Sequence, residues 1–338
     1  MKITTIGLDI AKSVFHLFAV NRVGKLVKKK QLKRKELLAY IAQLESCRIV
    51  MEACGGAHYW AREFIALGHE VKLIAPQYVK PFVKGNKNDY NDAEAIAEAS
   101  QRSSMRFVPI KSIEQQDVQN IHRQRERLKK ERTALVNQIR GLLAEYGIVI
   151  PQGITAVRRE LPLILEDAEN ALTVMTRTLF AELFDELCLL DQRLSGCDDR
   201  IKAANQGIDM CQRLEAVPGI GPITANALYA AGGNGSDFKN GRHFSAWLGL
   251  VPGQHSSGGK AVLLGISKRG NSYLRTLLIH GARAVLRYSA GKTDRFSRWA
   301  QALLERRGHN RACVAVANKL ARMAWVVMAK GEDYRPAV

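Results

Sequence analysis

The segment that most constrains this chain is NKNDYNDAEAIAE, residues 86–98, where a loop is predicted to run into a helix. Asn88 or Asp89 is a suitable N-cap, and Asp89 and Asp92, three residues apart, would project from one face of that helix. Two carboxylates held so close repel each other, and burying them without compensation is costly. The segment is therefore either a capped helix with a solvated acidic face or half of a divalent-metal site that needs further carboxylates.

The chain upstream supplies two such acids at the ends of predicted strands. Residues 3–8 form an apolar, β-branched run that leads to Asp9, and residues 48–51 form a short strand of the buried type that leads to Glu52. Further strands are predicted over 14–20, 26–32, 71–75 and 105–110, with helices over 37–44 and 59–67. Strands that end in acids and are mixed with helices predict an α/β sheet with ligands at one edge.

Asp9, Glu52, Asp89 and Asp92 would converge at this edge. Carboxylates are hard oxygen ligands, and a set without His or Cys suits Mg²⁺ or Mn²⁺ better than zinc. A metal ion held in this way can stabilise both the attacking and the leaving oxygen of a phosphodiester.

The net charge of +19 is distributed unevenly along the chain. Lys and Arg exceed Asp and Glu by 7 in residues 1–105, equal them in 106–205 and exceed them by 12 in 206–338. Two basic ends around a neutral middle predict two surfaces that meet a polyanion, although a merely basic soluble protein would share this charge.

Cysteine usage and hydropathy bear on the compartment. The six cysteines show no CxxC pair and no zinc spacing, which favours free thiols in a reducing cytoplasm. We find no signal-peptide pattern at the start and no apolar run near the ~18 residues that span a bilayer. These features predict a soluble, cytoplasmic protein.

Residues 115–205 show a helical repeat. Ile121, Leu128, Leu135 and Leu142 are seven residues apart, and a second apolar series steps by three and four between Leu187 and Ile201. Both series are typical of coiled-coil seams. They predict a long helical hairpin or arm over 111–205, interrupted near Pro151, Gly153 and Pro162 and suited to pairing with another protomer; the alternative is a helical bundle folded back on its own domain.

Two motifs follow in the C-terminal region. LEAVPGIGPITA, residues 214–225, is similar to a helix-hairpin-helix turn, whose glycines let backbone N–H groups approach a phosphate. Residues 249–275 combine a small Ser-Ser-Gly-Gly loop with four cations, namely Lys260, Lys268, Arg269 and Arg275. A flexible nucleophile beside cations suits attack on a phosphodiester, whereas the alternative is an ordinary Gly/Ser surface loop.

These motifs together resemble one family. GLDIAK, MEACGGAH and KNDYNDAEAIAEA, followed by GLVP, SSGGK and ISKRGN, resemble the DEDD transposases of bacterial insertion sequences, of the IS-one-ten and IS-eleven-eleven type. The resemblance spans nearly the whole chain. It implies a RuvC-like, RNase H-like α/β domain over 1–110, the coiled-coil arm over 111–205, and a mostly α-helical transposase domain over 206–338.

The resemblance also implies a division of labour. Asp9, Glu52, Asp89 and Asp92 would bind Mg²⁺ or Mn²⁺, while a serine of another subunit, Ser257 with Ser256 as runner-up, attacks the DNA. A structured guide RNA that pairs with donor and target DNA is implied, as is a dimer or tetramer. Two rival functions remain open, a metal-dependent junction endonuclease that uses water and an architectural nucleic-acid-binding protein without catalysis.

Overall fold

The computed structural model describes residues 2–85, 88–256 and 262–336. By its internal contacts the chain divides into two compact units, Met1–Glu114 and Gln115–Val338. The second unit contains both the helical arm and the C-terminal helices, so the further division near residue 205 stays a prediction.

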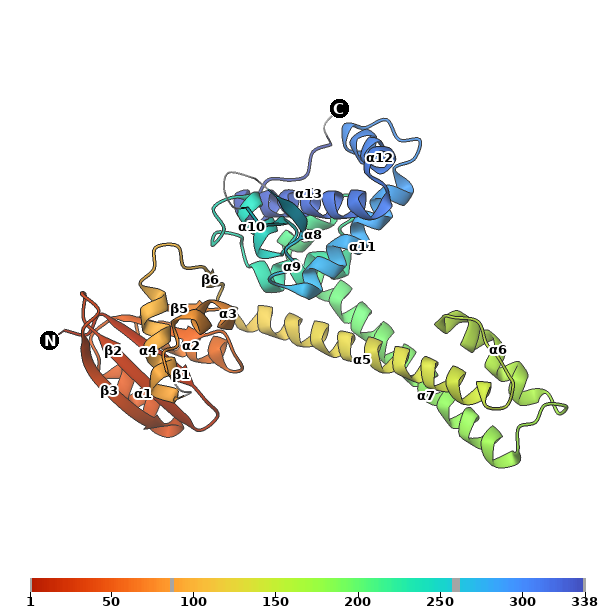
Figure 1. Ribbon diagram of the computed structural model, residues 1–338, viewed down its shortest axis with the longest axis horizontal. Helices are drawn as coiled ribbons and strands as arrows, with labels where there is room; N and C mark the ends of the chain where they lie inside the picture. Colours follow the sequence, from red (N-terminus) through yellow and green to blue (C-terminus); the bar gives the residue numbers. More distant parts are fainter. Residues whose placement is uncertain (1, 86–87, 257–261, 337–338) are drawn as a thin grey trace. The chain divides into compact units, whose positions relative to one another are not determined.

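The first unit is built on a six-stranded sheet in the order β3-β2-β1-β4-β5-β6 (Figure 1). β1, β2 and β3 are antiparallel neighbours, β4 and β5 run parallel to β1, and β6 is antiparallel to β5. The strands are β1 (Thr5–Ile10), β2 (Val14–Val20), β3 (Leu26–Lys33), β4 (Arg48–Glu52), β5 (Glu70–Ile74) and β6 (Phe107–Val108). The predicted mixed α/β domain is confirmed.

Helices cover both faces of this sheet. α1 (Arg34–Ala42) and α2 (Ala57–Ala66) pack on one face, and α3 (Pro76–Val79), the 3₁₀ turn Lys80–Phe82 and α4 (Asp89–Ser100) belong to the other. The central strand β4 alternates accordingly, because Ile49 and Met51 lie in the α1/α2 core whereas Val50 lies against α4. Strands buried on both faces have the continuous apolar character that residues 48–51 show.

In the second unit, the arm is a hairpin of α5 (Ile113–Ala144) and α7 (Val174–Gln206), with α6 (Ile154–Glu166) packed at its far end (Figure 1). Leu128, Leu135 and Ile139 of α5 are buried with Leu187 and Leu194 of α7 in one cluster. The two apolar series therefore pack against each other within the predicted helical hairpin. Pairing of the arm with another protomer stays a prediction.

Two details of the arm prediction are wrong. Leu142 is 37% exposed, and Leu143 is buried instead. An α-helix drifts by about 20° per seven residues, so a heptad series that starts at Ile121 rotates out of the interface by its fourth member. Pro162 also lies inside α6 rather than at a break, although Pro151 and Gly153 do precede that helix.

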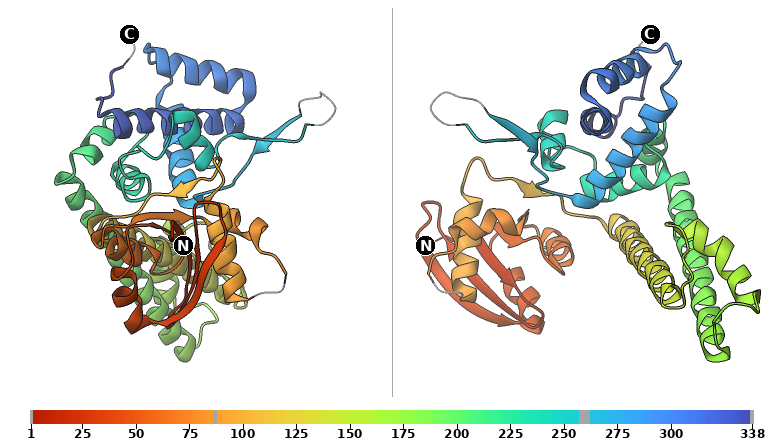
Figure 2. Two further views of the ribbon diagram at one scale, coloured as in Figure 1. Left: turned by 90° about the vertical axis from the view of Figure 1, so that its left-hand side faces the viewer. Right: turned by 45° about the vertical axis from the view of Figure 1, so that its right-hand side comes forward.

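The C-terminal helices enclose the largest apolar core. They are α8 (Asp209–Glu215), α9 (Pro222–Gly232), α10 (Gly241–Trp247), α11 (Ser272–Tyr288), α12 (Arg295–Arg307) and α13 (His309–Lys330). Strands β7 (Pro252–Gln254) and β8 (Leu263–Ile266) form a hairpin that projects from these helices (Figure 2). The predicted helical C-terminal region is confirmed.

α13 is longer and more apolar than expected, because no apolar segment near the length that spans a bilayer is predicted from the sequence. Its most apolar window has a mean hydropathy of 1.4, and by length and composition alone the helix could cross a membrane. Half of this window is buried inside the protein, where Val316, Leu320 and Ala324 contribute to the core. This burial is typical of a core helix, and the cytoplasmic location stays a prediction.

A buried chain of hydrogen bonds ties the arm to the C-terminal helices. The hydroxyl oxygen of Tyr273 on α11 lies 2.9 Å from Nδ1 of His122 on α5. On the other side of the ring, Oδ1 of Asn226 on α9 lies 3.0 Å from Nε2 of His122. Asn226 donates to Asn205 of α7, and Asn205 donates to Glu215 of α8 at 2.6 Å. Five helices thus share one polar network, which fixes the angle at which the arm leaves the core.

Candidate active site

The strand order explains why Asp9 and Glu52 lie at the same edge of the sheet. Asp9 lies near the end of β1 and Glu52 at the end of β4, and these strands are parallel neighbours with Leu8 opposite Met51. Because parallel strands end at the same edge of a sheet, both carboxylates reach that edge. Both residues are partly buried there.

A glycine on β1 brings the acidic helix to the same edge. A Cβ atom on Gly7 would lie 2.1 Å from the carbonyl oxygen of Ala93 and 2.7 Å from the nitrogen of Ala97, both on α4. Only a residue without a side chain allows this approach of helix to strand. Ala93 and Ala97 are themselves buried and small, so α4 lies directly on β1.

The start of α4 confirms the predicted cap. Asn88 is the N-cap, and its side chain accepts a hydrogen bond from the N–H of Tyr90 at 2.9 Å. Asp89 and Asp92 lie at the beginning of the helix, where the positive end of the helix dipole favours carboxylates. Asp89 is exposed and Asp92 is partly buried.

Three of the four predicted acids form one cluster. Asp9, Asp89 and Asp92 each offer a carboxylate oxygen, and these three oxygens lie within 4.8 Å of one another. Burial raises the pKa of Asp9 above its usual value, and the charges of Asp92 and Asp89 raise it further. Like charges at this spacing oppose ionisation, which is the electrostatic signature of a site that receives a cation.

Glu52 lies beside this cluster rather than within it. Burial raises the pKa of the Glu52 carboxyl, and the next contributions come from Asp9 and Asp92. Glu52 is therefore close enough to Asp9 and Asp92 to be affected by their charges.

The donor set fits a hard divalent cation. Within the described part of the chain, no Lys or Arg forms an ion pair with Asp9, Glu52, Asp89 or Asp92. The negative charge of these four acids is thus not balanced by a Lys or Arg ion pair among the described residues. Carboxylate oxygens in this number suit Mg²⁺ or Mn²⁺, and these four residues are the ones that would hold the ion.

His16 is a member of this site that sequence reasoning missed. It is 8% exposed, pairs with Asp9 across β1 and β2, and places Nδ1 at 3.5 Å from a carboxylate oxygen of Asp89. Its ring also contacts Tyr90 edge to face, with 4.8 Å between ring centroids. The sequence predicts strands over 3–8 and 14–20, but only their antiparallel register in the structure places His16 opposite Asp9.

The C-terminal serine segment lies on the β7–β8 hairpin (Figure 2). Ser257 and Lys260 lie outside the described residues. Ser256 is exposed, and its hydroxyl oxygen accepts hydrogen bonds from Gln254 Nε2 at 2.8 Å and from the N–H of Val262 at 3.3 Å. Ser256 therefore links Gln254, at the end of β7, to Val262, which precedes β8.

The predicted cations differ in what they do. Lys268 and Arg269 are exposed, whereas the guanidinium of Arg275 donates to the carbonyl of Leu248 at 3.0 Å and so supports the fold. Their segment is held by close backbone contact, because a Cβ on Gly249 would lie 2.2 Å from the carbonyl oxygen of Arg269. The GLVP and SKRGN motifs therefore pack against each other.

The turn between α8 and α9 has a packing role. Gly219 has a φ of +85°, and a Cβ there would lie 2.9 Å from the carbonyl oxygen of Gly281 on α11. Gly221 is exposed with open space around it. Gly219 thus allows the turn to pack closely against α11 in the core. Contact between this turn and a phosphate stays a prediction.

Comparisons with known proteins agree at both ends of the chain. A family model described as a transposase of the DEDD IS110 type matches residues 6–148, and the model of the transposase IS116/IS110/IS902 family matches residues 211–298. The first match includes all four acids, and the second includes the serine hairpin.

Several curated proteins are similar over their whole length. A probable family 20 transposase of Pseudomonas aeruginosa is 51% identical over 99% of this chain and 100% of its own. The transposase of insertion sequence element IS1111A of Coxiella burnetii is 50% identical over 98% of this chain and 92% of its own. A pilin gene-inverting protein of Moraxella bovis is 23% identical over 99% and 98%. The chain belongs to the IS116/IS110/IS902 family of insertion-sequence transposases, with a DEDD domain at its N-terminal end.

Proposed function

We propose that this transposase cleaves and exchanges DNA strands with a divalent cation held by Asp9, Asp89, Asp92 and Glu52 and with Ser257 as the nucleophile. The observation that carries the proposal is the cluster of three carboxylate oxygens, brought together by β1 and α4 without a compensating Lys or Arg in the described part of the chain. Such a cluster is costly for the fold unless a cation occupies it.

The acids differ in how exposed they are to solvent. Asp9 and Asp92, partly buried, have the least access to solvent screening, while His16 beside Asp89 limits the motion of that exposed carboxylate. When bound, Mg²⁺ or Mn²⁺ would polarise the scissile phosphate and offset charge on the leaving oxygen.

Ser257 would attack phosphorus with its hydroxyl oxygen. An O–P bond to the protein forms and a P–O bond of the DNA strand breaks. The serine gives its proton to solvent, and the departing oxygen takes up a proton from solvent and leaves as a hydroxyl group. A serine hydroxyl is a weak nucleophile, and the exposed cations Lys268 and Arg269 of the same region would offset charge on the phosphate. The family resemblance supports a serine that acts on a site of another subunit, with a guide RNA selecting donor and target DNA.

Trapping a covalent adduct tests the serine. We expect the wild-type protein with donor DNA and Mg²⁺ to give a protein–DNA species that survives denaturing gel electrophoresis. Ser257→Ala should remove this species and strand exchange while DNA binding is unchanged. Ser256→Ala is the matched control, since its hydroxyl is already engaged by Gln254 and Val262.

Each other outcome has a definite meaning. An adduct that persists in Ser257→Ala and disappears in Ser256→Ala would assign the nucleophile to Ser256. An adduct that persists in both variants would contradict a serine mechanism, and DNA cleavage without any adduct would favour hydrolysis by water. Cleavage that continues in excess chelator would contradict the metal site.

A further inference from the structure

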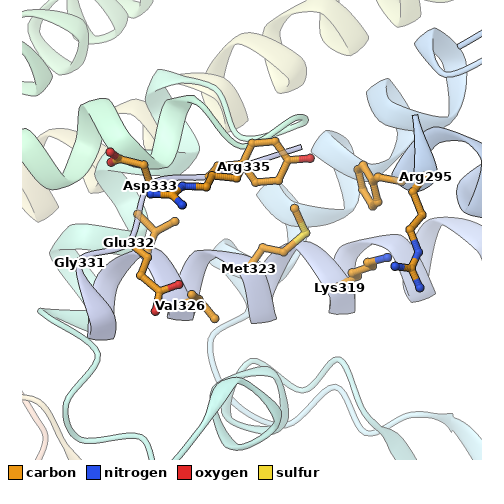
Figure 3. Close-up of a pocket in the computed structure, with 11 residues that line it drawn as sticks. Arg295, Lys319, Met323, Val326, Gly331, Glu332, Asp333 and Arg335 are labelled. Carbon is orange, nitrogen blue, oxygen red and sulfur yellow. The ribbon is translucent and has the colours of Figure 1, made fainter. Parts of the chain in front are cut away.

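A cavity of about 760 Å³ lies between α12, α13 and the C-terminal segment 331–335 (Figure 3). Its volume is typical of a site for a small organic ligand. Phe296, Met323, Val326 and Val327 give it an apolar lining, and Arg295 and Lys319 supply positive charge. None of these residues belongs to the acid cluster or to the serine hairpin.

Lys319 is held on an aromatic platform. Its ammonium nitrogen lies 4.2 Å from the ring centroid of Trp299 and 5.2 Å from that of Phe296, and the two rings are stacked with centroids 6.0 Å apart. Burial lowers the pKa of Lys319, and the charges of Arg295 and Arg322 lower it further. Arg295 and Lys319 therefore lie together at one end of the cavity, and Arg322, outside its lining, adds positive charge near Lys319.

The protein leaves these cations without an anionic partner. Among the residues that the structure describes, no Asp or Glu forms an ion pair with Arg295, Lys319 or Arg322. Figure 3 shows Glu332 and Asp333 at the opposite end of the cavity, and Glu332 approaches Lys330 instead, at 3.9 Å. A group of like charges without an anionic partner destabilises the fold, so the grouping of Lys319 with Arg295 and Arg322 indicates an external anion.

We infer that this cavity binds an unpaired nucleotide of a single-stranded nucleic acid. The phosphate would lie at Arg295 and Lys319, and the base would lie on Met323 and Val326 beside the ring of Tyr334. A cationic groove next to aromatic and apolar surface is the usual way to bind single strands, because every base has a face that can stack. The region from 206 to 338 has an excess of 12 positive charges, which attracts such a polyanion.

This inference goes beyond the proposed function and does not depend on it. Strand exchange produces and consumes unpaired DNA, and a guide RNA has unpaired segments, so both sources offer the same chemistry. The test separates them by using both strands, and it is run in chelator so that the acid cluster plays no part.

The experiment uses the full chain and fluorescein-labelled six-nucleotide single strands, of thymidine or of uridine, with the dissociation constant measured by fluorescence anisotropy in EDTA. Lys319→Gln should weaken binding about tenfold, as expected for the loss of a charged contact. The slope of the logarithm of the binding constant against the logarithm of the salt concentration should become less steep by about 0.7, because one phosphate contact is lost. Arg306→Gln is the matched control on α12, where Arg306 is exposed, and should change binding less than about twofold.

A second comparison tests the base. The wild-type protein should prefer the thymidine strand over an abasic strand of equal charge by about fivefold or more. Tyr334→Ala, a change in the C-terminal segment outside the helices, should reduce this preference. A larger Lys319→Gln effect on one strand type would identify DNA or RNA as the ligand.

Three results would overturn the inference. An equal loss of affinity in Lys319→Gln and Arg306→Gln would show that the cations form only a general basic surface. Equal affinity for thymidine and abasic strands would exclude a base site. Displacement of both strands by an acidic peptide at the same charge concentration would assign the cavity to a protein carboxylate instead.

Discussion

At the scale of single residues, the acid cluster is a charge arrangement that the fold alone does not favour. Burial and mutual repulsion raise the pKa of both Asp9 and Glu52, so the folded protein resists their ionisation. His16 partly offsets this through Asp89. Functional sites of this kind lower the stability of the folded protein, so removing one of the charges should raise that stability.

Asp92→Asn should therefore have opposite effects with and without metal. In EDTA the variant should be more stable by about 1 kcal/mol, because the charge that most strongly raises the pKa of Asp9 is gone. Asp92 lies in the first turn of α4, where the helix dipole favours the carboxylate by about 0.3–1 kcal/mol, and this loss reduces the expected gain in stability. Urea unfolding in EDTA and in Mg²⁺ measures both effects.

In Mg²⁺ the wild-type protein should gain stability, by about 2.7 kcal/mol at 100 times the dissociation constant, and Asp92→Asn should lose most of this gain together with DNA cleavage. Glu94→Gln on the same helix is the control, since Glu94 contacts Lys29 at 4.0 Å on the surface. Equal metal-dependent stabilisation of wild type and Asp92→Asn would remove Asp92 from the metal site.

At the scale of secondary-structure elements, the contact between β1 and α4 positions the site. Gly7 is the residue that permits it, as the carbonyl of Ala93 and the nitrogen of Ala97 occupy the space of a side chain. The acids of α4 are carried along with the helix, so their distance from Asp9 depends on this one close approach.

Gly7→Ala should destabilise the protein by about 2–3 kcal/mol, because the methyl group can be accommodated only if helix and strand move apart. Gly55→Ala is the control, since nothing lies within 4 Å of a Cβ there and its φ is not positive. Urea unfolding measures the difference. A loss below about 0.5 kcal/mol for Gly7→Ala would show that α4 does not lie as closely on β1 as described.

The hydrogen-bonded chain around His122 gives a prediction about the arm. Burial lowers the pKa of His122 to about 4, so the folded protein keeps this ring neutral while the unfolded chain protonates it near 6.5. The unfolded state therefore binds more protons between these values, and stability is lost as the pH falls from about 6.5 to 4.

Wild-type protein should lose about 3 kcal/mol more than His122→Gln over this pH range, by unfolding in urea at each pH. The glutamine of the variant cannot be protonated in this pH range. The difference between the two proteins therefore removes the contribution of the other seven histidines to the pH dependence of stability. Parallel pH profiles for the two proteins would mean that His122 is accessible to protons in the folded state.

At the scale of the whole molecule, the uneven charge predicts how nucleic acid is bound. Each neutralised phosphate releases counterions, so affinity should fall steeply with salt. If about six phosphates are contacted, the dissociation constant should rise about a thousandfold between 50 and 200 mM salt. Anisotropy with double-stranded DNA measures this slope, and a flat dependence would mean that the +19 charge serves another purpose.

The sequence by itself determined the strands, the acids at their ends and an N-cap at Asn88 or Asp89, because these depend on residues close in the chain; the structure shows that the cap is Asn88. Strand alternation, an N-cap and the three-residue spacing of Asp89 and Asp92 are local properties. The family motifs added the order of the two regions, and the family comparisons confirmed this membership.

Only the tertiary structure decided which distant groups meet. Asp9 reaches Asp89 and Asp92 because Gly7 has no side chain, and His16 enters the site because of strand register. The arm seam closes on its own chain because α7 returns beside α5, which a heptad pattern cannot specify. Local patterns report on neighbours within a few residues, whereas these contacts depend on how closely two backbones can approach.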